Sequence, residues 1–262
     1  MADMIDFNSD AARALERVYQ TPDVVGQRAR VLTELSLARG EAVLDVGVGP
    51  GLLSYDMAHT VGEGGTVAGI DIADAMLAMT SDRCKDLPQC DFRKGEATAL
   101  PFDDGGFDAL VSTQVYEYVP DMDQAAAEIA RVLKPGGRAV ILDTAWDSLV
   151  INASDRDLSA RVLEVWDEHL AHPNLPAKLA PVLERAGLQV MRVEIIPMFS
   201  PHYHTHSYAA GMLRMITNFV SGRSGISEAE AQAWYDDLIA GSERGDYFFS
   251  LNRYMFTAVK KG

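Results

Sequence analysis

Between residues 43 and 51 the chain reads Val43-Leu44-Asp45-Val46-Gly47-Val48-Gly49-Pro50-Gly51, an apolar run that ends in three glycines at alternate positions. The apolar run is typical of a buried strand, and the glycines permit a tight turn that brings the main chain close to a ligand. In a doubly wound sheet this turn lies at the carboxyl edge, where such folds bind ligands. Asp71 ends the next β-rich run, so its carboxylate can accept hydrogen bonds from the hydroxyls of a ribose.

Strands and helices alternate along the chain on both sides of this turn. Short β-rich runs cover 42–46, 66–70, 107–112 and 138–142, with helical stretches at 74–84 and 121–133. This alternation predicts crossover units, a parallel sheet and helices on both faces. Beyond residue 147 the pattern predicts helices near 155–171, 177–186, 208–220 and 227–240, and strands over 188–199 and 247–259. We therefore expect an α/β protein with a seven-stranded, mostly parallel, doubly wound sheet and additional helices.

Composition narrows the functional classes. Lysine and arginine total 23 against 38 aspartate and glutamate residues, so the formal net charge is −15, and the phosphates of a nucleic acid would be repelled. We therefore expect no nucleic-acid partner. No apolar run is long enough to span a membrane, and residues 1–6 lack the basic flank and apolar core of a signal peptide. The sequence thus predicts a cytoplasmic protein without a membrane partner.

Two residues of the turn disfavour a dinucleotide. The G-x-G-x-x-G fingerprint places a small residue where this chain has Leu52, and Pro50 removes an amide that a pyrophosphate would use. A nucleoside without phosphates suits the turn better, so a nicotinamide-dependent oxidoreductase is disfavoured.

The turn resembles motif I of the class I S-adenosylmethionine-dependent methyltransferases, in the form Asp45-x-Gly47-x-Gly49-x-Gly51. Three later segments resemble further motifs of that family in the same order and spacing: Gly69-Ile70-Asp71-Ile72-Ala73-Asp74-Ala75-Met76-Leu77, Gly95-Glu96-Ala97-Thr98-Ala99-Leu100-Pro101-Phe102 and Arg131-Val132-Leu133-Lys134-Pro135-Gly136-Gly137. The resemblance covers about residues 40 to 145 and is greatest to the UbiE-like, type 11 group that acts on small molecules. It implies a Rossmann-like methyltransferase fold whose last strand is antiparallel, and S-adenosyl-L-methionine as the cofactor.

The chain departs from the family pattern at three points. Glu96 stands where aspartate is commoner, which keeps the acceptor oxygen but lengthens the side chain. Where the family often has Glu-His after the fourth strand, this chain reads Gln114-Val115-Tyr116-Glu117-Tyr118, so a histidine base is missing there. The Asn-Pro-Pro-Tyr signature of methyltransferases that act on planar amide or base nitrogens is also absent. DNA, RNA and glutamine nitrogen are therefore disfavoured as substrates.

The resemblance implies four groups of cofactor-binding residues. The methionine end would be held by Asp45, Gly47, Gly49, Gly51 and Gln114. The ribose would be bound by Asp71, and the adenine would be contacted by Ile72, Met76, Glu96 and Ala97. The carboxylate would be met from the N-terminal helices by Tyr19 and Arg28, for which ordinary packing and a solvated helix face are the alternative explanations.

The catalytic group is not fixed by the sequence, and the candidates are His202, His204 and Tyr116. His202, His204 and His206 alternate in one run, so an extended chain would direct all three to one side. Such spacing can chelate zinc or nickel, although a polar loop is the simpler interpretation, and we expect no metal. The aromatic residues that could line an apolar acceptor site, or else belong to the core, are Tyr116, Trp146, Tyr208 and Tyr254.

We expect a single methyltransferase domain over residues 1–262, divided into a helical lid (1–40), a cofactor-binding core (41–147) and helical insertions that cover the acceptor (148–176 and 200–245). The expected reaction is in-line displacement that transfers a methyl group to a small organic acceptor, with oxygen or carbon favoured over nitrogen by elimination. A catalytically silent S-adenosylmethionine-binding sensor or partner subunit is the alternative, because intact cofactor motifs do not separate the two. A homodimer is also compatible with the sequence.

Overall fold

The computed structural model describes residues 9–262, so the first eight residues of the expected lid lie outside the described range. The strands are β1 (Ala42–Val46), β2 (Thr66–Asp71), β3 (Cys90–Lys94), β4 (Phe107–Thr113), β5 (Leu133–Ile151), β6 (Leu188–Ser200) and β7 (Phe249–Lys260). The helices are α1 (Ser9–Tyr19), α2 (Pro22–Leu35), α3 (Leu52–Val61), α4 (Asp74–Arg83), α5 (Met122–Val132), α6 (Arg156–Asp167), α7 (Pro176–Arg185), α8 (Tyr208–Val220) and α9 (Glu228–Arg244), with a short 3-10 turn η1 (Tyr116–Tyr118). Among the described residues, no helix combines the length and hydrophobicity needed to cross a bilayer.

The strands form one seven-stranded sheet in the order β3-β2-β1-β4-β5-β7-β6. β1 lies between two parallel neighbours, since Leu44 pairs with Ala68 of β2 and with Leu110 of β4. β7 is antiparallel to both β5 and β6. The predicted doubly wound α/β fold with an antiparallel last strand is therefore confirmed.

Alternate positions along the strands supply a core on each face of the sheet. Leu44 belongs to the core covered by α5 and α7, in which Ile129 is fully buried. Its neighbour Val43 belongs to the opposite core, where α2 and α3 contribute Leu35 and Met57. Because helices cover both faces, the carboxyl ends of the parallel strands are left as the edge at which a ligand can bind.

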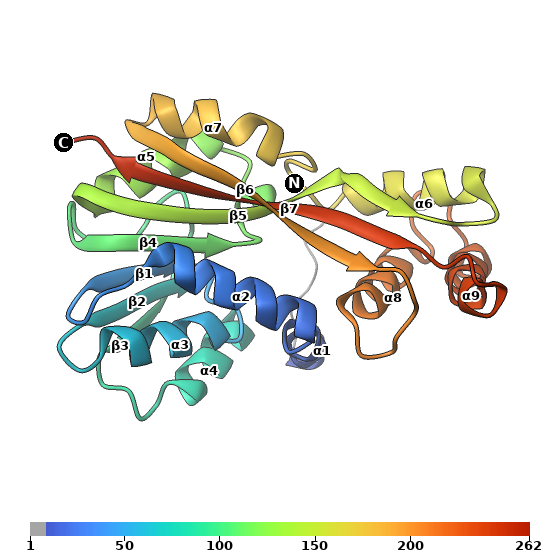
Figure 1. Ribbon diagram of the computed structural model, residues 1–262, viewed down its shortest axis with the longest axis horizontal. Helices are drawn as coiled ribbons and strands as arrows, with labels where there is room; N and C mark the ends of the chain where they lie inside the picture. Colours follow the sequence, from blue (N-terminus) through green and yellow to red (C-terminus); the bar gives the residue numbers. More distant parts are fainter. Residues whose placement is uncertain (1–8) are drawn as a thin grey trace.

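Strands β5, β6 and β7 extend past the ends of β1 and β4 (Figure 1). The sequence predicted residues 138–142 for the fifth strand, whereas β5 covers Leu133–Ile151, because β7 continues to pair with it as far as Ile151 opposite Phe249. Around this extension, α6, α8 and α9 pack on a third core that contains Trp166 and Trp234. The later helices therefore rest on prolonged strands, which place them beyond the carboxyl edge of the sheet.

Candidate functional site

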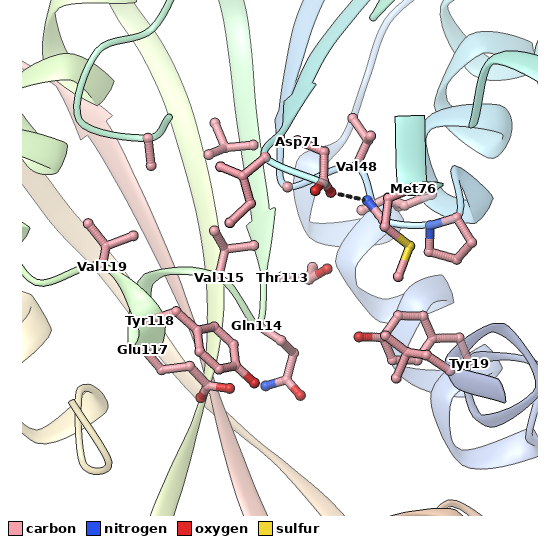
Figure 2. Close-up of a pocket in the computed structure, with 18 of the residues that line it drawn as sticks. Tyr19, Val48, Asp71, Met76, Thr113, Gln114, Val115, Glu117, Tyr118 and Val119 are labelled. Atoms are coloured by element: carbon pink, nitrogen blue, oxygen red, sulfur yellow. Dashed lines mark hydrogen bonds between the residues drawn. The ribbon is translucent and has the colours of Figure 1, made fainter. Parts of the chain in front are cut away.

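A cavity of about 670 Å³ lies at the carboxyl ends of β1, β2 and β4 (Figure 2). Its lining comes from the segments 15–31, 46–53, 70–76, 95–98 and 113–120, together with Trp146, Trp166, Tyr208, Met212, Met215 and Arg253. The volume is that of a small-molecule site. Figure 2 shows Asp71 and Met76 toward one part of the lining and Glu117 and Tyr118 toward another.

The glycine turn after β1 uses its N–H groups inside the protein. Gly47 and Val48 donate to the carbonyl oxygen of Ile70, at 2.9 and 3.0 Å. Gly51 donates to the carbonyl oxygen of Val48 at 3.0 Å, and Gly49 donates to the carboxylate of Asp71. Pro50 has no N–H. Turns of this kind bind a pyrophosphate through free N–H groups. With those groups occupied, this turn suits a nucleoside without phosphates.

Two glycines of the turn have no room for a side chain. A Cβ atom on Gly47 would lie 2.2 Å from Cγ2 of Val115, and one on Gly51 would lie 2.9 Å from Cα of Thr80. Their φ angles are 80° and 77°, a region that residues with a Cβ rarely adopt. Gly47 and Gly49 line the cavity, whereas Gly51 caps α3 and lies outside the lining.

Asp71 lies at the end of β2 and lines the cavity beside the glycine turn. Its Oδ2 accepts a hydrogen bond from the N–H of Gly49 at 2.9 Å, and its Oδ1 accepts one from the N–H of Ala73 at 2.9 Å (Figure 2 draws the first). Burial raises the pKa of Asp71, against the effect of these donors. Each carboxylate oxygen has a further lone pair with which it can accept a ligand hydroxyl.

Asp45, which the sequence assigned to the methionine end, lies beneath the turn and does not line the cavity. Its side chain is buried, and its Oδ2 accepts a hydrogen bond from the hydroxyl of Ser54 on α3. Burial raises the pKa of Asp45 to about 7. In the structure this aspartate therefore fastens the end of β1 to α3.

The other expected cofactor residues all line the cavity, and they are Tyr19, Arg28, Ile72, Met76, Glu96, Ala97 and Gln114. Arg28 also forms an ion pair with Asp56 on α3, at 2.9 Å between Nε and Oδ2. Its Nη1 donates to the carbonyl oxygen of Tyr19 at 3.4 Å. These contacts hold the end of α1 and the middle of α2 against α3, the helix that follows the glycine turn.

Gln114 follows β4 with an unusual backbone conformation, since its φ is 60°. Its N–H donates to the carbonyl oxygen of Leu142 at 2.7 Å, and its Nε2 donates to the hydroxyl of Thr144. A non-glycine residue with positive φ stores strain, and such residues concentrate at functional sites. The hydrogen bonds to β5 hold Gln114 in this conformation on the cavity wall.

Two carboxyl groups that the sequence did not single out lie after β4 and within β5. Glu117 lines the cavity, is fully buried, and accepts a hydrogen bond from the N–H of Thr144 at 3.1 Å. Asp143 accepts hydrogen bonds through Oδ1 from the N–H groups of Val115 and Glu117, while its Oδ2 has no partner. Burial raises the pKa of Glu117 to about 7 and that of Asp143 well above its usual value. One sequence signal could have identified Glu117: it lies in the segment 114–118, where the family often has Glu-His after the fourth strand.

Part of the cavity is lined by aromatic and thioether side chains and one arginine. We define this aromatic chamber by Tyr118, Trp146, Trp166, Tyr208, Met212, Met215 and Arg253. The rings of Trp146 and Trp166 meet edge to face, with centroids 5.3 Å apart. The sequence suggested Trp146 and Tyr208 for such a wall, but neither Trp166 nor Arg253.

The residues suggested as catalytic lie elsewhere. His202 and His204, like His206, are exposed after β6 and do not line the cavity. Tyr116 is fully buried in the core beside α5, and its hydroxyl has no hydrogen-bond partner. Tyr254 packs against the same core. Within residues 9–262, no group of three or more His, Cys, Asp or Glu side chains is arranged to hold a metal ion.

Comparison with known proteins places the chain in a family. Residues 44–141 match a family model described as a methyltransferase domain. The chain is 30% identical over 250 residues to an uncharacterized 37.1 kDa protein in a transposon of Streptomyces fradiae. The aligned region covers 95% of this chain and 71% of that protein. It is 32% identical over 179 residues to the 2-phytyl-1,4-naphtoquinone methyltransferase of Thermosynechococcus vestitus, which covers 63% of this chain and 78% of the relative. Other quinone methyltransferases are matched over about half of their length.

A solved structure shows the same fold. Phosphoethanolamine N-methyltransferase 2 of Haemonchus contortus, in complex with S-adenosyl-L-methionine, superimposes with a TM-score of 0.65 at 20% identity and covers 98% of this chain and 58% of that chain. Together, the fold, the glycine turn and the relatives show that the chain belongs to the class I S-adenosylmethionine-dependent methyltransferases, in the UbiE-like group. It is an enzyme of that family, and S-adenosyl-L-methionine is its cofactor.

Proposed function

We propose that the cofactor binds with its ribose at Asp71 and its methionine end over the glycine turn. Gly47, Gly49 and Gln114 would contact the methionine end from below. The adenine would lie against Ile72, Met76, Glu96 and Ala97, and the N-terminal helices would close the site through Tyr19 and Arg28. The fit is supported by a turn without free N–H groups and by carboxylate oxygens of Asp71 that have lone pairs left for a diol.

In methyl transfer the residues around the cavity hold the acceptor, exclude water and accept a proton. The bound cofactor supplies a methyl group on a sulfonium, which is already activated for displacement. The walls of the aromatic chamber hold the acceptor in line with that methyl group and exclude water. Glu117 accepts a proton when the acceptor has to lose one, because its pKa of about 7 suits a general base near neutral pH.

We infer that the acceptor is a small organic molecule and that it is methylated on oxygen or carbon. The observation that carries this inference is the continuity of one cavity from Asp71 to a buried carboxyl group, Glu117, on the wall of an aromatic chamber. Hydroxyls and carbon acids need such a base, whereas an unprotonated amine does not. The relatives named 2-phytyl-1,4-naphtoquinone and demethylmenaquinone methyltransferase act by their names on quinones, which is compatible with an aromatic wall.

The test is a transfer assay with S-adenosylmethionine labelled in the methyl group and a panel of phenols, quinols, thiols and amines. We expect label on an oxygen or carbon acceptor, and a rate lowered by about 100-fold or more in Glu117→Gln, with cofactor binding unchanged. Label on amines alone would overturn the proposed acceptor atom. Cofactor binding without transfer to any compound would instead favour the silent sensor or partner subunit.

A further inference from the structure

Arg253 is a buried cation on the wall of the aromatic chamber. It lies on β7, and only 1% of its surface is exposed. Its Nη1 donates to the amide oxygen of Gln27, and its Nη2 donates to the hydroxyl of Tyr208 at 2.8 Å. The guanidinium also lies 4.5 Å from the centroid of the Tyr208 ring. Its Nε has no hydrogen-bond partner.

The partners of Arg253 are all neutral groups. Within the described part of the chain, no carboxylate forms an ion pair with it, in contrast to Arg28 on the same cavity, which is paired with Asp56 at 2.9 Å. A guanidinium stays protonated in proteins, and an uncompensated buried charge is costly. The structure therefore contains a cation that lacks an anion.

The titratable groups around Arg253 do not supply that anion as full charges. Glu117 feels the charge of Arg253, yet burial still raises its pKa to about 7, and burial also raises the pKa of Asp143 beside it. The remaining neighbours that titrate are the phenols of Tyr19, Tyr118 and Tyr208, whose pKa values are all raised by burial. The carboxylate of Asp23 accepts a hydrogen bond from the N–H of Tyr208 at 3.2 Å but forms no ion pair with Arg253. Near pH 7, Glu117 therefore carries only part of a negative charge and the phenols carry none, so the charge of Arg253 is not fully compensated.

Another unpartnered group of the chamber is also a hydrogen-bond donor. The indole Nε1 atom of Trp166 is buried without a partner, and Trp166 lines the cavity, whereas the indole of Trp146 faces the carboxyl group of Glu117. An indole N–H can only donate. Buried polar groups are normally satisfied, so Nε1 of Trp166 and Nε of Arg253 indicate a ligand that brings oxygen acceptors.

Arg253 is separated from the glycine turn by the order of the strands. The glycine turn follows β1, while Arg253 lies on β7, with β4 and β5 between them. Three strand spacings correspond to roughly 14 Å. Arg253 pairs in the sheet with Thr144, next to Glu117 on the side of the chamber. This position favours contact with the acceptor over contact with the cofactor.

We propose that the methyl acceptor is an acid, with an apolar or aromatic body and a carboxylate that binds Arg253. The proposal rests on the proposed function and narrows its substrate class. A carboxylate matches the planar donor geometry of a guanidinium and can also accept hydrogen bonds from the hydroxyl of Tyr208. The rings and thioethers of the chamber then pack on the apolar body of the acid.

The test compares benzoate with benzamide, two probes of nearly the same shape that differ in charge. Binding to the protein saturated with S-adenosylhomocysteine is measured by calorimetry. We expect the wild-type protein to bind benzoate about tenfold or more tightly than benzamide. Arg253→Gln should lose this preference, Arg253→Lys should keep part of it, and the control Arg192→Gln, at an exposed site on β6, should keep all of it.

Three results of the probe comparison would overturn the proposal. These are equal binding of the two probes to the wild-type protein, no binding of either probe, and a preference that survives in Arg253→Gln. A large loss of S-adenosylhomocysteine affinity in Arg253→Gln would also overturn it, because Arg253 would then serve the cofactor. A wild-type protein that does not bind S-adenosylhomocysteine would refute the proposed function instead, so the two failures are distinguishable.

Discussion

At the scale of single residues, Asp71 combines two roles, because it fixes the glycine turn through the N–H of Gly49 and faces the ligand. We predict that Asp71→Ala weakens S-adenosylhomocysteine binding by about 1.5–3 kcal/mol for each lost hydrogen bond to the carboxylate. Titration calorimetry measures this difference. The control is Asp74→Ala, which removes an exposed carboxylate nearby that is paired with Lys94. Equal affinities for the Asp71 variant and the wild type would remove Asp71 from the ribose site.

Glu117 links the stability of the ligand-free fold to pH. Burial raises its pKa from 4.5 to about 7, so between these values the folded protein keeps a proton that the unfolded chain releases. The contribution of Glu117 to stability is therefore intact below pH 4.5 and is lost as the pH rises through about 7. We predict that Glu117→Gln reduces this loss by up to about 3 kcal/mol.

Urea unfolding between pH of about 5 and about 8 measures the loss of stability in both proteins. Asp45, whose pKa burial also raises to about 7, is present in both and cancels in the comparison. The same pH dependence in the variant and the wild type would show that Glu117 is ionised in the folded state across this range.

Single residues were also the least predictable part of the site. The sequence drew attention to Tyr254, but successive strand residues face opposite sides, and it is Arg253 that lines the cavity while Tyr254 packs on the core. In the same way, Tyr116 is buried in the core, whereas Glu117 and Tyr118 line the cavity. Which residues of a short turn face a ligand depends on the neighbouring strand, here β5, and no local pattern encodes it.

At the scale of elements, the turn between β1 and α3 requires glycine for both conformation and space. Gly47 and Gly136 have nearly equal φ angles, 80° and 79°, but a Cβ on Gly47 would meet Val115 at 2.2 Å, whereas nothing lies within 4 Å of one on Gly136. We predict that both alanine variants lose about 1–2 kcal/mol of stability from the left-handed conformation. Gly47→Ala should lose about 1–3 kcal/mol more from the steric conflict.

Chemical denaturation measures both losses. In the double variant Gly47→Ala/Val115→Ala, the additional loss should shrink, because the side chain in conflict is shortened. Equal losses for the two single variants would show that the Gly47 turn can open without cost.

The elements themselves were largely predictable, because apolar runs and helical periodicity are local signals. The strand at 42–46 was predicted with the bounds that β1 has, and the helix at 208–220 with those of α8. The fifth strand was predicted too short, because the residues after 142 become a strand only by pairing with β7. That pairing joins residues about a hundred positions apart, so the extension that supports α6, α8 and α9 was not visible in the sequence.

At the scale of the whole molecule, the cavity lies between the cores of the sheet and the third core, around α6, α8 and α9. A ligand bound there contacts elements of both, so its binding should stabilise the whole fold. At a ligand concentration of 100 times Kd, the gain is about 2.7 kcal/mol. For a chain of this size we predict a rise in Tm of about 5–10 °C with S-adenosylhomocysteine, and no rise with NADH, as scanning calorimetry can measure. A rise with NADH alone would favour the oxidoreductase that the turn disfavours.

A crystal structure of the complex with S-adenosylhomocysteine is the most direct test of the site as a whole. The predicted result is a ribose whose hydroxyls bond to Asp71, an adenine beside Ile72 and Met76, and a sulfur atom that faces Gln114 and the aromatic chamber. A ribose bound away from Asp71, or a ligand outside this cavity, would contradict the proposed cofactor site.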